Sequence, residues 1–148
     1  MPASRESANE TNTGRLLHGG SSGCPGQYVE KLGDWLLWES PNEHDDFETR
    51  IIALAKEQGV RGVYRKHLSR HVRGKNVEAL SPTLIFGEAA PDRFVVRENG
   101  LNFELSFCEG YSYGLFLDQR DNRRRLLKHR VAPGFELFET DGAQPTLL

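Results

Sequence analysis

The pair Asn99-Gly100 is the strongest constraint on the fold of this chain, because it separates two runs in which apolar and polar residues alternate. The first run covers residues 93–98 and the second covers residues 101–107. Asn-Gly is a preferred two-residue turn of a β-hairpin, since both residues tolerate the positive φ angles that this turn needs. The alternation places one face of each strand against a core and the other in water. The sequence therefore predicts an antiparallel hairpin over residues 93–107.

A second hairpin is predicted over residues 28–39. Aromatic and aliphatic residues fill both arms, and Gly33-Asp34 supplies the turn. Trp35 and Trp38 fit a core position better than a platform on which nucleic-acid bases stack. Short strands are also predicted at residues 60–64 and 81–87.

One main helix is predicted to begin near residue 47 and to end before Gly59. Acidic side chains crowd residues 43–48, where the helix dipole favours negative charge, and apolar residues then recur at helical spacing. Gly59 suits the left-handed residue that closes many helices. The dipole also explains His44, Asp45 and Asp46 better than a metal cluster does, and no metal site is predicted.

These elements predict an α+β fold, in which a small mixed or antiparallel sheet carries one main helix and is followed by a β-hairpin and a connector segment. Residues 1–13 are small and polar without periodicity, and we expect a disordered tail there. Residues 14–92 are predicted to form a central α/β domain. Residues 93–148 are predicted to form the hairpin and a connector.

Composition narrows the class of protein. The 148 residues carry a net charge of -2, and the two cysteines, Cys24 and Cys108, are far apart, which argues against a zinc ribbon or a disulfide framework. No run approaches the roughly 20 apolar residues of a membrane span, and the first residues lack the apolar core of a signal peptide. We therefore expect a cytoplasmic protein. The glycine-rich residues 19–26 fit a turn better than a phosphate-binding P-loop, because no lysine follows at the required position.

Residues 61–75 carry positive charges without an acidic residue among them. Such a segment suits contacts with RNA phosphates, which supply affinity rather than sequence specificity. The alternative is a solvated surface balanced by the acidic start of the preceding helix. The candidate RNA-binding residues here are Arg61, Arg65, Lys66, Arg70, Arg73 and Lys75.

Residues 111–125, YSYGLFLDQRDNRRR, join an apolar run to a basic run. One interpretation is a strand face containing Leu115 and Leu117, followed by the charged start of a helix at residues 118–125. Residues 98–127 also resemble the segment just upstream of the catalytic domain in class I S-adenosylmethionine-dependent methyltransferases. The nearest group is that of the bacterial large-subunit rRNA cytosine methyltransferases, whose "G(F/Y)(F/Y)LDQR.NR" motif is matched by residues 114–123. Residues 15–34 are similar to a further family segment in diverged form, so that the resemblance covers residues 14–137.

The resemblance implies roles for several side chains. Phe116, Asp118, Gln119 and Arg120 would contribute to the S-adenosylmethionine site, and Arg123 and Arg124 would contact RNA. The family's cofactor domain and its catalytic cysteine would lie beyond residue 148. Neither cysteine of this chain matches that catalytic residue, so no catalytic residue is assigned, and we expect the isolated chain to be inactive and not to bind the cofactor.

Two functions are therefore expected. The first is part of an rRNA cytosine methyltransferase that is truncated before its cofactor domain, with rRNA and the missing domain as partners. The alternative is a non-catalytic module that binds RNA or another protein.

Overall fold

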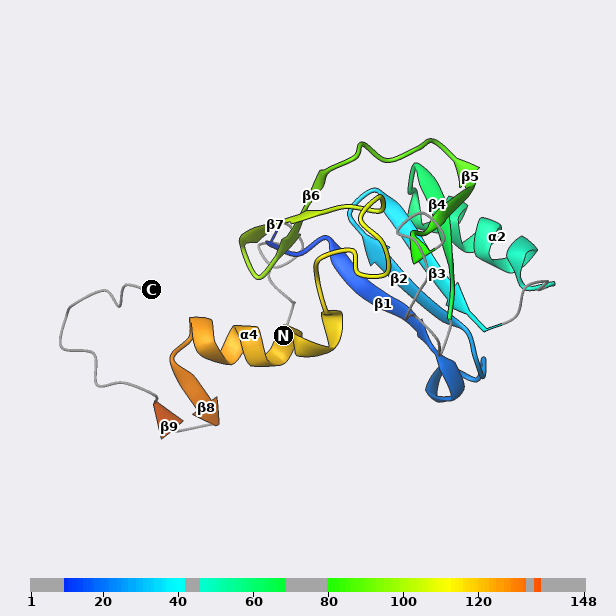
Figure 1. Ribbon diagram of the computed structural model, residues 1–148. Coiled ribbons are helices and arrows are strands. Elements are labelled where there is room, and N and C mark those ends of the chain that lie inside the picture. Colours follow the sequence, from blue (N-terminus) through cyan, green and yellow to red (C-terminus); the bar gives the residue numbers. More distant parts are fainter. Residues whose placement is uncertain (1–9, 42–45, 69–79, 133–134, 137–148) are drawn as a thin grey trace. The chain divides into compact units, whose positions relative to one another are not determined.

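The computed structural model describes residues 10–41, 46–68, 80–132 and 135–136 (Figure 1). The chain divides into two compact units, Met1–Leu117 and Asp118–Leu148, which are described separately. Among the described residues, no helix has the length and apolar character needed to cross a membrane. His44 and Asp45 of the acidic cluster, and the basic residues from 70 to 75, lie outside the described residues.

The first unit is built on a five-stranded sheet in the order β1-β2-β3-β4-β5. The strands are β1 (Thr13–His18), β2 (Tyr28–Leu32), β3 (Trp35–Ser40), β4 (Gly62–His67) and β5 (Thr83–Gly87). All neighbouring strands are antiparallel except β3 and β4, which are parallel and are connected through helix α2 (Glu48–Gln58). The predicted α+β class, with its mixed sheet, is confirmed.

Local sequence signals explain the turns. Gly33, at φ +63°, joins β2 to β3, and Gly59, at φ +64°, closes α2, so the predicted hairpin over residues 28–39 and the predicted helix end are both confirmed. A 3-10 turn, η1 (Gly19–Ser22), connects β1 to β2 as the glycine-rich segment predicts.

The two faces of the sheet are covered by different elements, because successive side chains of a strand point to opposite faces. On one face, Leu36, Trp38 and Val63 pack with Ile51 and Ala55 of α2. The other face is covered by the hairpin of β6 (Phe94–Glu98) and β7 (Leu101–Leu105), together with residues that follow it. Its core consists of Leu32, Trp35, Leu37, Tyr64, Phe94, Val96, Leu105, Phe107, Leu115 and Leu117.

The predicted Asn99-Gly100 turn is confirmed. Both residues have positive φ angles, +50° and +79°, and Glu98 pairs with Leu101 directly across the turn. Asn12 fastens this hairpin to the sheet. Its backbone N–H donates to the Arg97 carbonyl at 2.9 Å, its side-chain oxygen accepts from the Arg97 N–H at 2.7 Å, and its carbonyl accepts from the Gly33 N–H at 3.0 Å.

The second unit contains helix α4 (Arg120–Leu127) and the short strands β8 (Arg130–Ala132) and β9 (Phe135–Glu136). A 3-10 turn, η2 (Leu117–Gln119), precedes α4. The helix start predicted at residues 118–125 is confirmed. The strand predicted at Leu115 and Leu117 is wrong, because Gly114, at φ +107°, turns the chain and the two leucines enter the core from a segment without strand pairing.

Candidate functional site

The segment 111–117, which we call the tyrosine segment, lies on the sheet face that the hairpin covers. Leu115 and Leu117 are buried in the core of that face, whereas the intervening Phe116 has 66% of its surface exposed. The Tyr113 carbonyl accepts a hydrogen bond from the Ser106 N–H at 3.2 Å. The segment therefore belongs to the packed body of the first unit.

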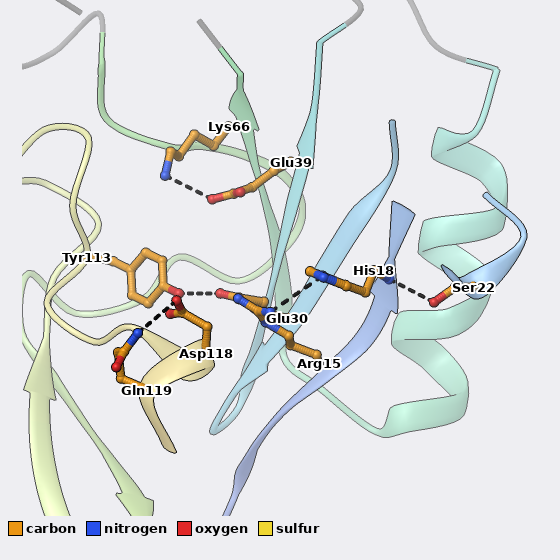
Figure 2. Close-up of polar contacts among 9 residues, drawn as sticks. All are labelled: Arg15, His18, Ser22, Glu30, Glu39, Lys66, Tyr113, Asp118 and Gln119. Carbon is orange, nitrogen blue, oxygen red and sulfur yellow. Dashed lines mark hydrogen bonds and ion pairs between the residues drawn. The ribbon is translucent and has the colours of Figure 1, made fainter. Parts of the chain in front are cut away.

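Tyr113 is bound by a buried carboxylate (Figure 2). Its hydroxyl donates to Oε2 of Glu30, a β2 residue with 8% of its surface exposed. The other oxygen of Glu30 accepts from Nε of Arg15 at 3.2 Å, across the β1–β2 pair. Arg15 in turn lies 3.5 Å from Nδ1 of His18. A polar chain thus runs from the end of β1 to the tyrosine segment.

Burial controls the acid–base properties of this contact. It raises the pKa of the Glu30 carboxyl, an effect that the Tyr113 hydrogen bond and the Arg15 charge offset in part and the nearby Glu39 reinforces. Burial also raises the pKa of the Tyr113 phenol, and the negative charge of Glu30 raises it further. Both shifts favour the neutral side chains.

Tyr111 is held by a buried ammonium. Nζ of Lys66 lies 3.8 Å from the centroid of the Tyr111 ring and 2.9 Å from Oε1 of Glu39. Glu39 and Lys66 are directly paired in the β3–β4 register, and the Lys66 side chain is 5% exposed. A cation over an aromatic face is attracted by the ring quadrupole, and the attraction is stronger away from water. Figure 2 shows Lys66 reaching toward Glu39.

These contacts hold the tyrosine segment in place rather than form a catalytic arrangement. The charged groups of Glu30 and Lys66 are each engaged by an opposite charge and by a tyrosine. No pattern in the sequence predicted a functional role for Arg15, Glu30, Glu39, Tyr111 or Tyr113. A signal was present, since Glu30 shares its strand face with the core residue Leu32, and a charged residue at such a position needs a buried partner.

Glu30→Gln should become more stabilising, relative to the parent chain, as the pH rises. Because the folded-state pKa of Glu30 is raised above its ordinary value of 4.5, the folded protein holds this proton more tightly than the unfolded chain. The stability due to the proton is fully present below pH 4.5 and is lost as the pH rises through the folded pKa, whereas glutamine has no such proton. Urea unfolding of both chains between pH 4 and 7 tests this, with exposed Glu88→Gln as the control. A stability difference that stays constant, or that shifts toward the parent chain at pH 7, would contradict it.

The four residues predicted to bind the cofactor are divided between the two units. Phe116 belongs to the first unit, which ends at Leu117, whereas Asp118, Gln119 and Arg120 belong to the second. Phe116, Asp118 and Gln119 are exposed; Asp118 accepts from Nε2 of Gln119 at 3.3 Å, and Gln119 accepts from Nδ2 of Asn122 at 2.8 Å. None of the four lines the described pocket of about 250 Å³, whose walls are Arg93, Glu104, Leu105, Ser106, Glu109, Ser112, Tyr113 and Gly114. Their contribution to an S-adenosylmethionine site stays a prediction.

The residues predicted to bind RNA lie in different settings. Arg61 is exposed and pairs with Glu88 at 2.6 Å, Arg65 is half-buried with its guanidinium 4.5 Å from the centroid of a Trp38 ring, and Lys66 is buried in the pair described above. Arg70, Arg73 and Lys75 lie outside the described residues. On α4, Arg123 is half-buried and Arg124 is exposed. Among the described segments predicted to bind RNA, helix α4 therefore exposes the most positive charge.

Comparisons with known proteins place the chain in a family. No protein-family model matches it. A ribosomal RNA large subunit methyltransferase from Deinococcus radiodurans is 32% identical over 120 residues, which are 79% of this chain and 29% of that protein. Ribosomal RNA large subunit methyltransferase I from Aeromonas salmonicida is 28% identical over 123 residues, which are 80% of this chain and 30% of that protein. This chain is homologous to part of the large-subunit ribosomal RNA methyltransferases. The resemblance found in its motifs is thereby confirmed.

Solved structures agree with this relationship. A Streptococcus mutans protein named as a SAM-dependent methyltransferase shares the fold, with a TM-score of 0.64 and 24% identity, over 86% of this chain and 33% of its own. A methyltransferase structure in complex with SAH (S-adenosylhomocysteine) has the same TM-score at 25% identity, over 86% of this chain and 32% of its own. The chain thus spans about a third of the length of the methyltransferases that it matches.

Proposed function

We propose that this chain supplies the body and the connector of an S-adenosylmethionine-dependent rRNA methyltransferase that modifies cytosine. The homology over 120 residues to a protein named for large-subunit rRNA methylation carries this proposal. The resemblance of the 114–123 motif to the family segment upstream of the catalytic domain supports a position just before the cofactor domain of such an enzyme. S-adenosylmethionine supplies the methyl group in these enzymes, and we propose that residues beyond those described here form most of its site.

Helix α4 is the part that we propose contacts RNA. Its sequence, RDNRRRLL, contains four arginines and one acid, and Lys128 follows directly. Arg120, Arg124 and Lys128 recur every four residues, so they lie in one row along the helix, with Arg123 beside them. At a rise of about 1.5 Å per residue, neighbouring charges in that row are about 6 Å apart, a spacing that suits successive phosphates of one strand. Arginine binds phosphate with two parallel hydrogen bonds, which favours this role.

Exchanging Arg123 and Arg124 for alanine should weaken RNA binding and reduce its dependence on salt. Each lost phosphate contact makes the slope of log affinity against log salt shallower by about 0.7 to 0.9, so the double variant should lose about 1.5. Titration of a large-subunit rRNA fragment between 50 and 200 mM salt, roughly the range over which such contacts weaken, measures both quantities.

The matched control is Arg50→Ala with Lys56→Ala, which removes two positive charges from exposed positions of α2. It should leave the slope close to that of the parent chain. A parent affinity that does not respond to salt, or an equal loss in both double variants, would contradict the role of α4.

A further inference from the structure

The tyrosine segment is held by directional contacts from separate parts of the first unit. Glu30 of β2 binds the Tyr113 hydroxyl, and Lys66 of β4 lies under the ring of Tyr111. Ser106, just after β7, donates its N–H to the Tyr113 carbonyl. A hydrogen bond requires the hydroxyl at one place, and a cation–π contact requires the ring in one orientation. Together they fix both the position and the rotation of the segment.

The contacts bury charge, which is a poor way to gain stability. Glu30 and Lys66 have 8% and 5% of their surfaces exposed, and apolar residues of similar volume often stabilise a core equally well. Apolar contacts from Leu115 and Leu117 hold the same segment, but they specify its geometry less sharply. The buried polar groups are therefore better explained by a need for one defined arrangement than by a need for stability.

We propose that Tyr111 and Tyr113 are positioning residues, which hold the chain against the sheet as far as Leu117 and direct Phe116 outward. The outward direction of the Phe116 side chain follows from the fixed position of this segment. Its two neighbours, Leu115 and Leu117, are buried, whereas 66% of the Phe116 surface is exposed. Among the described residues of the first unit, Phe116 is the exposed aromatic residue closest in sequence to the 118–123 part of the motif. The value of fixing it for methyl transfer rests on the proposed function, whereas the placement rests on the contacts alone.

The test uses a nitroxide spin label at Phe116→Cys, in a chain with Cys24→Ser and Cys108→Ser. The label should report an ordered backbone in this parent and should gain mobility after Tyr113→Phe, which removes one hydroxyl. Hydrogen exchange of the Ser106 amide should accelerate about ten-fold in the same variant, as expected for loss of one hydrogen bond to a charged group. Tyr111→Leu should also increase the mobility of the label. Tyr111→Phe, which keeps the ring over Lys66, should leave the label as ordered as in the parent.

The control is Tyr64→Phe, because the Tyr64 hydroxyl lies in the same core and accepts a hydrogen bond from the Ala90 N–H at 2.8 Å. It should leave both readouts at residues 106 and 116 unchanged. Glu30→Gln, which keeps an acceptor for Tyr113, should leave the label ordered.

A label whose mobility is unaffected by Tyr113→Phe would overturn the proposal. An equal rise in exchange at Val29 and Leu36 would also overturn it, since Tyr113 would then support the whole core. Neither readout involves RNA or S-adenosylmethionine. Failure of RNA binding with an ordered label would therefore count against the proposed function alone.

Discussion

Replacing Gly62 by alanine should destabilise the first unit by about 3 kcal/mol or more, the upper range for forcing atoms into a packed site. Gly62 on β4 stands directly opposite Gly87 on β5. A Cβ atom on Gly62 would overlap the backbone oxygen of Glu88 and lie 3.2 Å from that of Phe86. These are backbone atoms of a neighbouring segment, so the chain at β5 must shift and its pairing with β4 must weaken. Urea unfolding followed by far-UV circular dichroism measures the loss.

Gly14→Ala is the matched control. Gly14 also lies in a strand, β1, but a Cβ atom there would meet nothing within 4 Å. Removing the conformational freedom of glycine in a strand should stabilise the protein by about 0.5 kcal/mol. Equal effects of the two substitutions would show that the close approach of β4 and β5 does not constrain the fold.

Glu39→Ala should cost about 3 kcal/mol, because it leaves the Lys66 ammonium buried without an opposite charge. The loss should include the contact of Lys66 with Tyr111, since an uncompensated ammonium will seek water. The combined change Glu39→Leu with Lys66→Met removes both charges and should cost much less. Urea unfolding at neutral pH compares the variants.

The Arg61–Glu88 pair provides the control for this effect. It is as short as 2.6 Å, but its side chains are 55% and 66% exposed. Glu88→Ala should therefore cost less than about 1 kcal/mol. If Glu39→Ala costs no more than Glu88→Ala, the Lys66 pair is not the buried anchor that the geometry indicates.

Local signals explain why much of the fold could be predicted from the sequence. The Asn99-Gly100 turn, the glycine that ends α2 and the charged start of α4 each depend on residues close together in the chain. The parallel pairing of β3 with β4 and the Asn12 contacts were not predicted, since they join residues far apart in sequence. Residues 115–117 were wrongly predicted as a strand. Their side chains do alternate between buried and exposed, as in a strand, but the backbone pairs with no neighbouring strand.

The candidate site was predictable only in part, for the same physical reason. Resemblance of residues 114–123 to a known motif predicted a connector and a family, and the homologues confirm the family. The contact between Glu30 and Tyr113 spans 83 positions in the chain, and no local pattern specifies such a partner. The sequence did show that Glu30 is a charged residue on the inward face of a strand. Such a residue needs a buried partner, but the sequence does not indicate which residue it is.

Calorimetric titration of S-adenosylmethionine into the 148-residue chain tests most directly whether these residues are a body and connector without a cofactor site of their own. Phe116, Asp118 and Gln119 are exposed, and none of them lines the described pocket, so we expect no saturable binding heat. Saturable binding with micromolar affinity, abolished by Phe116→Ala, would contradict that prediction and would show that the 116–120 residues form a cofactor site by themselves.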